Sequence, residues 1–248
     1  MLKVFSDIEE LNNFAAEKFV ETCRQSIEKG NQFSVALSGG STPKALYQLL
    51  ASDKFKARIE WNKVFFFFGD ERNVLPDNKE SNFRMANENL FQPLQIPGNQ
   101  IFRWKTEEKD AEKIAEDYEA AIKSFFGLNK EKSFPRFDLI LLGMGPDAHT
   151  ASLFPFTEAL HENEKIAVLN YVEKLQTTRL TVTFPVINNA ENIGFLVAGA
   201  EKAEPLREVL EGEFEPEKFP SQKVRPSNGN LFWLIDEKAA ALLSDKNL

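Results

Sequence analysis

Four runs of apolar residues constrain this chain most, because each is followed at once by a polar turn that contains glycine. The clearest run, VFFFFGD at residues 64–70, would be apolar on both faces of an extended strand. Such runs are typical of parallel strands that are covered by helices on both sides. The other three lie at residues 33–38, 137–145 and 192–199.

Helical patterns separate these runs and predict how the sheet is built. Apolar residues recur at helical spacing in five segments, at residues 7–29, 43–50, 81–91, 110–126 and 201–210. The first of these is expected to start at a cap by Ser6 or Asp7 and to stop at Gly30. Further strands are expected at residues 179–187 and 230–236, the latter followed by a helix at 237–243. This alternation predicts an α/β fold with a mostly parallel sheet and helices on both faces.

The overall composition narrows the classes of function. The 248 residues carry a net charge of −8 and no basic run, which argues against a nucleic-acid partner. No apolar run is long enough to cross a membrane, and the N-terminus does not resemble a signal peptide. The lone Cys23 cannot form an internal disulfide, so a cytoplasmic location is expected. Without repeats or low-complexity linkers, one domain over residues 1–248 is expected.

The turn SGGSTP follows the first buried run and precedes a helix. Gly39 and Gly40 allow a tight turn with exposed backbone N–H groups, and Ser41 and Thr42 add hydroxyls. The N-terminus of the following helix would favour an anion such as phosphate at this place. An ordinary strand-to-helix turn capped by Thr42 explains the same residues equally well when the turn is considered alone.

Two other turns supply charged residues. In GDERNV, Arg72 has the geometry to hold a phosphate with two donors, and Asp70 to hold sugar hydroxyls or a catalytic proton. Lys202 lies in the first turn of a helix, where a cation opposes the helix dipole unless an anion is bound. Arg179 opens a predicted strand and is expected to face the same site. The alternatives are an ion-pair cluster on a solvated loop and a solvated lysine.

The turn GMGPDAHT holds His149, one of only two histidines. A neutral histidine is a competent general base near pH 7, and Asp147 is placed to fix its tautomer. The alternative is a helix-capping Asp147 beside a surface histidine. The second histidine, His161, is expected to be exposed. Because ligands of parallel sheets bind beyond the carboxyl ends of the strands, we expect the four turns to form one site.

Taken together, the segments ALSGGSTP, GDERNVLPDNKESN, GMGPDAHTASLFP and RLTVTFPVINNAENIGFLVAGAEKAEPLREVLEG resemble the glucosamine-6-phosphate isomerase/6-phosphogluconolactonase family, and within it the lactonases. The resemblance covers nearly the whole chain in order. It implies a Rossmann-like fold, hydrolysis of 6-phospho-D-glucono-1,5-lactone to 6-phosphogluconate in the oxidative pentose phosphate pathway, and no metal or other cofactor.

The chain departs from the family pattern at three places. Ala148 and Phe156 stand where glycine is common, and alanine at position 148 costs stability if the backbone there has a positive φ. Phe154 stands where the deaminases of the family carry a glutamate that relays protons. This last departure favours lactone hydrolysis over deamination.

The resemblance leads to a mechanistic hypothesis. His149 removes a proton from water, backbone N–H groups near Gly143 and Gly145 hold the oxyanion, and the cationic side chains with SGGSTP hold the phosphate. No nucleophile motif of the G-x-S-x-G type is present, so an acyl-enzyme is not expected. The partner is a small-molecule sugar phosphate, and the protein is expected to be a monomer or weak homo-oligomer. An amino-sugar-phosphate isomerase or deaminase and a non-catalytic sugar-phosphate sensor remain as alternatives.

Overall fold

The computed structural model describes residues 1–129 and 133–244. The expected single domain over 1–248 therefore includes two short segments, 130–132 and 245–248, that lie outside the described residues. One continuous cluster of buried apolar side chains runs from Phe5 to Leu243. One domain over the chain therefore stays our proposal.

A six-stranded sheet forms the centre of the fold, and all of its strand pairs are parallel, in the order β1-β9-β8-β5-β2-β3. The predicted parallel sheet is therefore confirmed. Strand β3 is buried almost throughout, as its apolar sequence requires. The strands are β1 (Leu2–Phe5), β2 (Phe33–Leu37), β3 (Val64–Phe68), β5 (Leu139–Leu142), β8 (Asn192–Val197) and β9 (Asn230–Asp236).

The long helices follow the predicted segments closely, and α1, α3 and α5 each begin at a side chain that caps the helix. They are α1 (Ile8–Gly30), α2 (Ser41–Leu50), α3 (Asn82–Ala86), α4 (Gln92–Leu94), α5 (Ala111–Phe126), α6 (Phe184–Asn188) and α7 (Ala203–Glu211). Asp7 caps α1 by accepting a hydrogen bond from Glu10 N at 2.9 Å. The predicted stop at Gly30 is confirmed, and the next residue, Asn31, caps the helix in the left-handed conformation.

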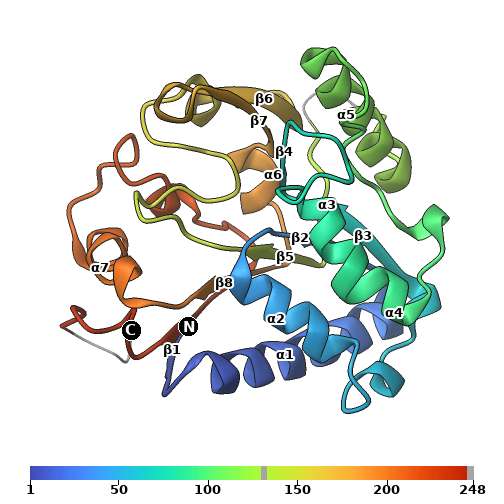
Figure 1. Cartoon of the computed structure of the whole chain (residues 1–248), viewed down its shortest axis with the longest axis horizontal. Coiled ribbons are helices and arrows are strands. Elements are labelled where there is room, and N and C mark those ends of the chain that lie inside the picture. The colour runs from blue at the N-terminus through green and yellow to red at the C-terminus, as the bar shows by residue number, and fades with distance from the viewer. Residues whose placement is uncertain (130–132, 245–248) are drawn as a thin grey trace.

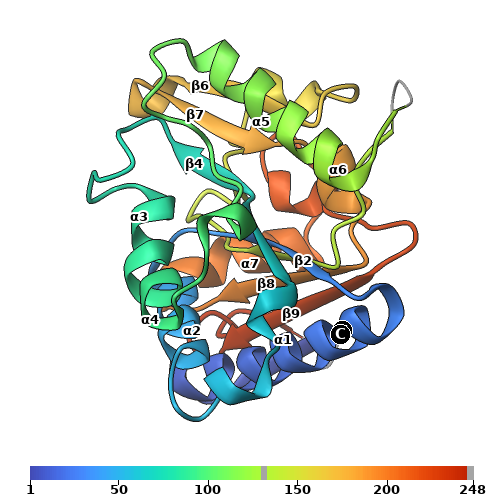
Figure 2. The same ribbon diagram turned by 90° about the vertical axis from the view of Figure 1, so that its right-hand side faces the viewer.

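Both faces of the large sheet are covered, as Figure 2 shows for α1 on one side and α5 on the other. On β3, Phe67 packs against Phe125 of α5 with ring centroids 5.1 Å apart. The next residue back, Phe66, packs against Phe91 at 5.0 Å, on the other face. Side chains of a strand alternate between faces, so neighbouring phenylalanines bury against different layers.

A second, antiparallel sheet in the order β4-β7-β6 was not predicted. Its strands are β4 (Asp70–Arg72), β6 (Ala167–Val172) and β7 (Thr177–Val182), and it lies above the large sheet in Figure 1. The predicted strand at residues 179–187 is therefore too long, because it ends at Val182. Pro185 cannot donate to a strand ladder and is well suited to the first turn of α6.

The predicted helix at residues 237–243 is also wrong, because the structure has successive turns there. The Asp236 carboxylate accepts a hydrogen bond from Ala239 N at 2.7 Å and also faces Gly199 N at 3.1 Å. Asp236 therefore binds the turn after β9 to the turn after β8. A helix of seven residues is marginal by itself, so the hydrogen bonds that Asp236 makes decide the conformation of this segment.

Candidate active site

The four predicted turns follow β2, β3, β5 and β8, which are neighbours in the order β8-β5-β2-β3. All four strands are parallel, so their carboxyl ends and the turns beyond them lie along one edge of the sheet. From β2 the chain passes to β3 on one side of β2, and after β3 it returns to form β5 on the other side. Such a change of direction is where ligands bind in open α/β sheets.

A pocket of about 280 Å³ opens at this edge. The predicted residues that line it are Asp70, Arg72, Asp147, His149 and Arg179, and the others are Pro146, Ala151, Ser152, Phe154, Lys174 and Leu175. The structure therefore brings together the proposed base, two carboxylates and two arginines. Residues 39–42 of the SGGSTP turn and Lys202 do not line this pocket themselves.

The loop after β5 holds His149 against Asp147, with His149 Nδ1 2.5 Å from Asp147 Oδ1. Gly145 is required beneath this pair, because a Cβ there would lie 2.1 Å from the imidazole ring. Gly145 N also donates to His149 O at 2.9 Å. The Gly145 N–H is thus used to close the loop in this structure, and its predicted oxyanion role stays a prediction.

Burial, together with the positive charges of Lys202, Arg179 and Arg72, lowers the pKa of His149 to about 4, although the charge of Asp70 acts in the opposite direction. The imidazole is therefore neutral near pH 7, as a general base must be. Its ring stacks on Phe154 with centroids 4.0 Å apart. Phe154 is the residue that, by the family resemblance, stands where the deaminases carry a glutamate.

Asp70 is buried and its carboxylate is already hydrogen bonded. Ser152 Oγ donates to Asp70 Oδ2 at 2.7 Å, and Asn82 Nδ2 donates to the Asp70 carbonyl at 3.0 Å. Gly39 packs so closely on Asn82 that a Cβ would lie 2.0 Å from its amide oxygen. Asn82 therefore connects the SGGSTP turn to Asp70 on the neighbouring strand.

Arg72 and Arg179 lie directly opposite each other across β4 and β7. Like charges in such a pair repel and destabilise a sheet unless an anion lies between them. Burial and the charge of Arg72 both lower the pKa of Arg179. Arg72 Nη1 donates to Glu80 O at 2.5 Å, which fixes one side of its guanidinium. The pair is suited to an anionic group.

The SGGSTP turn leads into α2 through Gly40, whose φ is 109°. The helix has no side-chain cap, so the alternative in which Thr42 caps an ordinary turn is not observed. Lys202 lies on the short turn Ala200–Lys202 that precedes α7, with Glu201 4.0 Å away. Its effect on the pKa of His149 places its charge within range of the pocket.

Sequence reasoning missed three polar residues of the site. Ser152 and Asn82 support Asp70, and the Lys174 ammonium forms an ion pair with the second oxygen of Asp147. Ser152 lies three residues after His149, so the quoted motif contained it without indicating its role. Lys174 comes from the connection between β6 and β7, an antiparallel pair that the sequence did not reveal.

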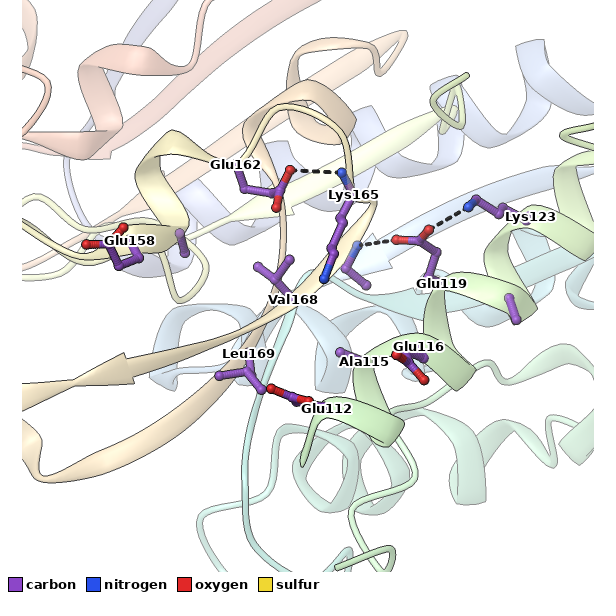
Figure 3. Close-up of a pocket in the computed structure, with 13 residues that line it drawn as sticks. Glu112, Ala115, Glu116, Glu119, Lys123, Glu158, Glu162, Lys165, Val168 and Leu169 are labelled. Carbon is purple, nitrogen blue, oxygen red and sulfur yellow. Dashed lines mark hydrogen bonds and ion pairs between the residues drawn. The ribbon is translucent and has the colours of Figure 1, made fainter. Parts of the chain in front are cut away.

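A separate pocket of about 570 Å³ lies between α5 and β6 (Figure 3). It is acidic, with Glu112, Glu116, Glu119, Glu158 and Glu162 on its walls. Two of these carboxylates already have structural partners, because Glu119 accepts from Ile166 N at 2.7 Å and Glu162 from Glu164 N at 2.7 Å. None of the residues predicted to act on substrate lies there.

In residues 1–129 and 133–244, no helix is long and apolar enough to cross a membrane. Within the same ranges, no three His, Cys, Asp or Glu side chains gather as a metal site. The fold and the pocket together define a Rossmann-like α/β protein with a neutral, half-buried histidine beside two facing arginines.

A family model described as glucosamine-6-phosphate isomerases/6-phosphogluconolactonase matches residues 6–233. The chain belongs to this family. A 6-phosphogluconolactonase of Synechocystis sp. is 41% identical over 215 residues, which cover 87% of this chain and 86% of that protein. A second, from Chlamydia pneumoniae, is 35% identical over 239 residues, or 95% and 88% of the two chains.

Solved structures agree with the fold. The 6-phosphogluconolactonase from Trypanosoma cruzi has a TM-score of 0.87 and 31% identity, with 98% of this chain and 96% of that chain covered. A monomeric glucosamine-6-phosphate deaminase of the NagB superfamily has a TM-score of 0.80 at 24% identity, with 98% and 100% covered. The second likeness establishes a shared fold only.

Proposed function

We propose that this protein hydrolyses 6-phospho-D-glucono-1,5-lactone to 6-phospho-D-gluconate, as a carboxylic ester hydrolase of the oxidative pentose phosphate pathway. The observation that carries the proposal is a neutral, half-buried His149, held by Asp147, in a pocket with two facing arginines. The relatives named as 6-phosphogluconolactonases support the same substrate.

In the proposed mechanism, His149 Nε2 takes a proton from water as the water attacks the C1 carbonyl of the lactone. Nδ1 keeps its own proton and donates a hydrogen bond to the Asp147 carboxylate, which orients the ring and stabilises the imidazolium. The tetrahedral oxyanion then collapses, and the imidazolium protonates the departing ring oxygen. The backbone near Gly143 remains our proposal for the oxyanion site.

The phosphate end of the substrate is proposed to bind Arg72 and Arg179, with Lys202 and the N-terminus of α2 at Gly39, Gly40, Ser41 and Thr42 nearby. This anchor is remote from C1, so its binding energy orients the lactone. Asp70 is proposed to position the pocket through Ser152 and Asn82 and to offset the surrounding positive charge. We propose no metal or other cofactor, because water activated by His149 suffices for a reactive lactone.

We propose that the reaction takes place in the cytoplasm, where a buried, unpaired Cys23 is stable, and that the protein is a monomer or a weak homo-oligomer. The second candidate function is an amino-sugar-phosphate deaminase or isomerase. Its main difficulty is Phe154, which stacks on His149 where that chemistry would need a carboxylate to relay protons.

The test compares two substrates on the same protein preparation. Freshly generated 6-phosphogluconolactone should be hydrolysed well above its spontaneous rate, and glucosamine 6-phosphate should release no ammonia. Ammonia release without lactone hydrolysis would replace the proposal with the second candidate. Binding of 6-phosphogluconate without turnover of either substrate would favour a sugar-phosphate sensor.

A further inference from the structure

Lys174 contacts the histidine loop from a different element. It lies on the short turn Glu173–Leu175 that joins β6 to β7 in the small sheet. Its ammonium pairs with Asp147 Oδ2, while Asp147 Oδ1 lies 2.5 Å from His149 Nδ1. One carboxylate therefore bridges a lysine and the proposed base, with one oxygen for each.

Lys174 is also part of the wall that supports the imidazole. Its ammonium lies 5.1 Å from the centroid of Phe154, the ring on which His149 stacks. The lysine lines both the site pocket and an adjoining hollow of about 1030 Å³. Asp147 and Phe154 also line both of these cavities. Lys174 thus stands at the boundary between the catalytic pocket and the open surface.

An ordinary surface ion pair would explain a lysine beside a carboxylate, and such pairs contribute little to stability. Two features distinguish this one. The Asp147 side chain is only 23% exposed, and it contacts the proposed base directly. The pair also connects two segments that are distant in sequence, so it fixes the small sheet relative to the loop after β5.

We propose that Lys174 is a positioning residue, which holds the Asp147 carboxylate turned so that it fixes the tautomer and orientation of His149. The inference rests on the proposed lactonase function. With Nδ1–H donated to Asp147, the lone pair of Nε2 is left to accept the proton from water. Partners of a base-orienting group commonly affect activity strongly without touching substrate.

The charge of Lys174 has a second consequence, because it offsets the charge of the Asp147 carboxylate that contacts His149. The other charged groups that act on the imidazole are Asp70, Arg72, Arg179 and Lys202. Without Lys174, the negative charge of Asp147 acts on the imidazole uncompensated, which makes protonation of His149 easier. The pKa of His149 should therefore rise when the lysine charge is removed.

The kinetic test compares Lys174→Met, Lys174→Arg and Lys218→Met. Lys218 lines the adjoining hollow but not the site pocket, so it is the matched control. We expect Lys174→Met to lower kcat roughly tenfold with KM changed less than about twofold, since the base is misaligned and the phosphate anchor is intact. Lys174→Arg should recover most of the rate, and Lys218→Met should match wild type.

A second readout does not depend on turnover. In a His161→Asn background His149 is the only histidine, so its ¹⁵N signals report tautomer and pKa directly. The Nδ1–H tautomer should dominate with Lys174, and in Lys174→Met its population should fall and the pKa rise by about half a unit or more. An unchanged tautomer and pKa would overturn the proposal, as would a kinetic effect confined to KM. Inactive wild type with the expected spectra would instead overturn only the lactonase assignment.

Discussion

At the scale of single residues, the protonation of His149 is decided by its surroundings. Burial and three nearby cations favour the neutral ring, and the negative charge of Asp70 opposes them. A histidine with this environment acts as a base over a wider pH range than one in solvent. The sequence predicted the residue and its partner Asp147, but the burial that sets the pKa depends on tertiary packing.

The first prediction concerns the pH dependence of kcat/KM, which reports the free enzyme. Since only neutral His149 takes a proton, activity should stay level as pH falls from 8 to about 5 and decline through the pKa of about 4. Initial rates of lactone hydrolysis, corrected for the spontaneous reaction, measure this profile. A decline centred near pH 6.5 would show that the imidazole titrates as it does in water.

The second prediction concerns Ala148, which has φ 60° and is fully buried. Alanine at this position therefore adopts a left-handed conformation that costs an L-residue about 1–2 kcal/mol. The lower conformational entropy of alanine in the unfolded chain offsets part of this cost. Ala148→Gly should raise the free energy of unfolding by about 0.5–1 kcal/mol in urea titrations.

Ala115 is the matched control for this substitution, because it is buried in the interior of α5. Ala115→Gly should destabilise the protein by about 1 kcal/mol through lost helix propensity. A loss of stability in Ala148→Gly as well would mean that the loop does not hold the strained conformation. Phe156 also has a positive φ, of 59°, where the family comparison expected glycine.

At the scale of elements, periodicity identified the interior strands of the large sheet and every long helix. Periodicity did not reveal the small sheet, because β4 has only three residues and a single residue separates it from β3. It also missed β6, whose pairing with β7 depends on contacts across a hairpin and not on a strong apolar run. The site turns could be predicted because each follows a buried strand. The place of Lys174 could not be predicted, because it lies on the turn between two strands of the small sheet, which the sequence did not reveal.

The third prediction concerns Glu71 of β4, which is buried and organises the start of α3. Its carboxylate accepts from Asn82 N and Phe83 N, each at 2.8 Å, and from Ser81 Oγ at 3.1 Å. Glu71→Gln turns an NH₂ group toward these donors. The variant should lose about 2–3 kcal/mol of unfolding free energy in denaturant titrations, since charged hydrogen bonds are lost within a buried cluster.

Glu88 provides the control for Glu71→Gln, because it lies on the following π-helical turn Asn87–Phe91 and forms an exposed pair with Arg84. Glu88→Gln should change stability by less than about 0.5 kcal/mol. Equal, small effects of the two substitutions would show that the carboxylate cluster around Glu71 does not anchor α3.

At the scale of the whole molecule, a protein of net charge −8 places Arg72, Lys174 and Arg179 together in the walls of one pocket, where we propose that an anion binds. The large sheet supplies Lys202 and the N-terminus of α2, and the small sheet supplies Arg72 and Arg179. The site therefore depends on the way the two sheets meet. A local concentration of positive charge attracts an anionic substrate against the overall field.

The fourth prediction uses this arrangement. 6-Phosphogluconate should raise the thermal midpoint, because a ligand at 100 times its Kd stabilises the native state by about 2.7 kcal/mol. Gluconate, which lacks the phosphate, should not. In Arg179→Ala the shift should largely disappear, whereas Arg24→Ala on the exposed face of α1 should keep it. A full shift in Arg179→Ala would place the phosphate elsewhere.

The most direct measurement is the turnover of 6-phosphogluconolactone by wild type, His149→Asn and His161→Asn, each corrected for spontaneous hydrolysis. His161 is the other histidine and its side chain is 61% exposed, so it controls for loss of an imidazole as such. The account predicts that His149→Asn lowers kcat by about 10²–10⁴-fold and that His161→Asn has wild-type activity. Wild-type turnover in a folded His149→Asn variant would contradict the central claim that His149 activates the water.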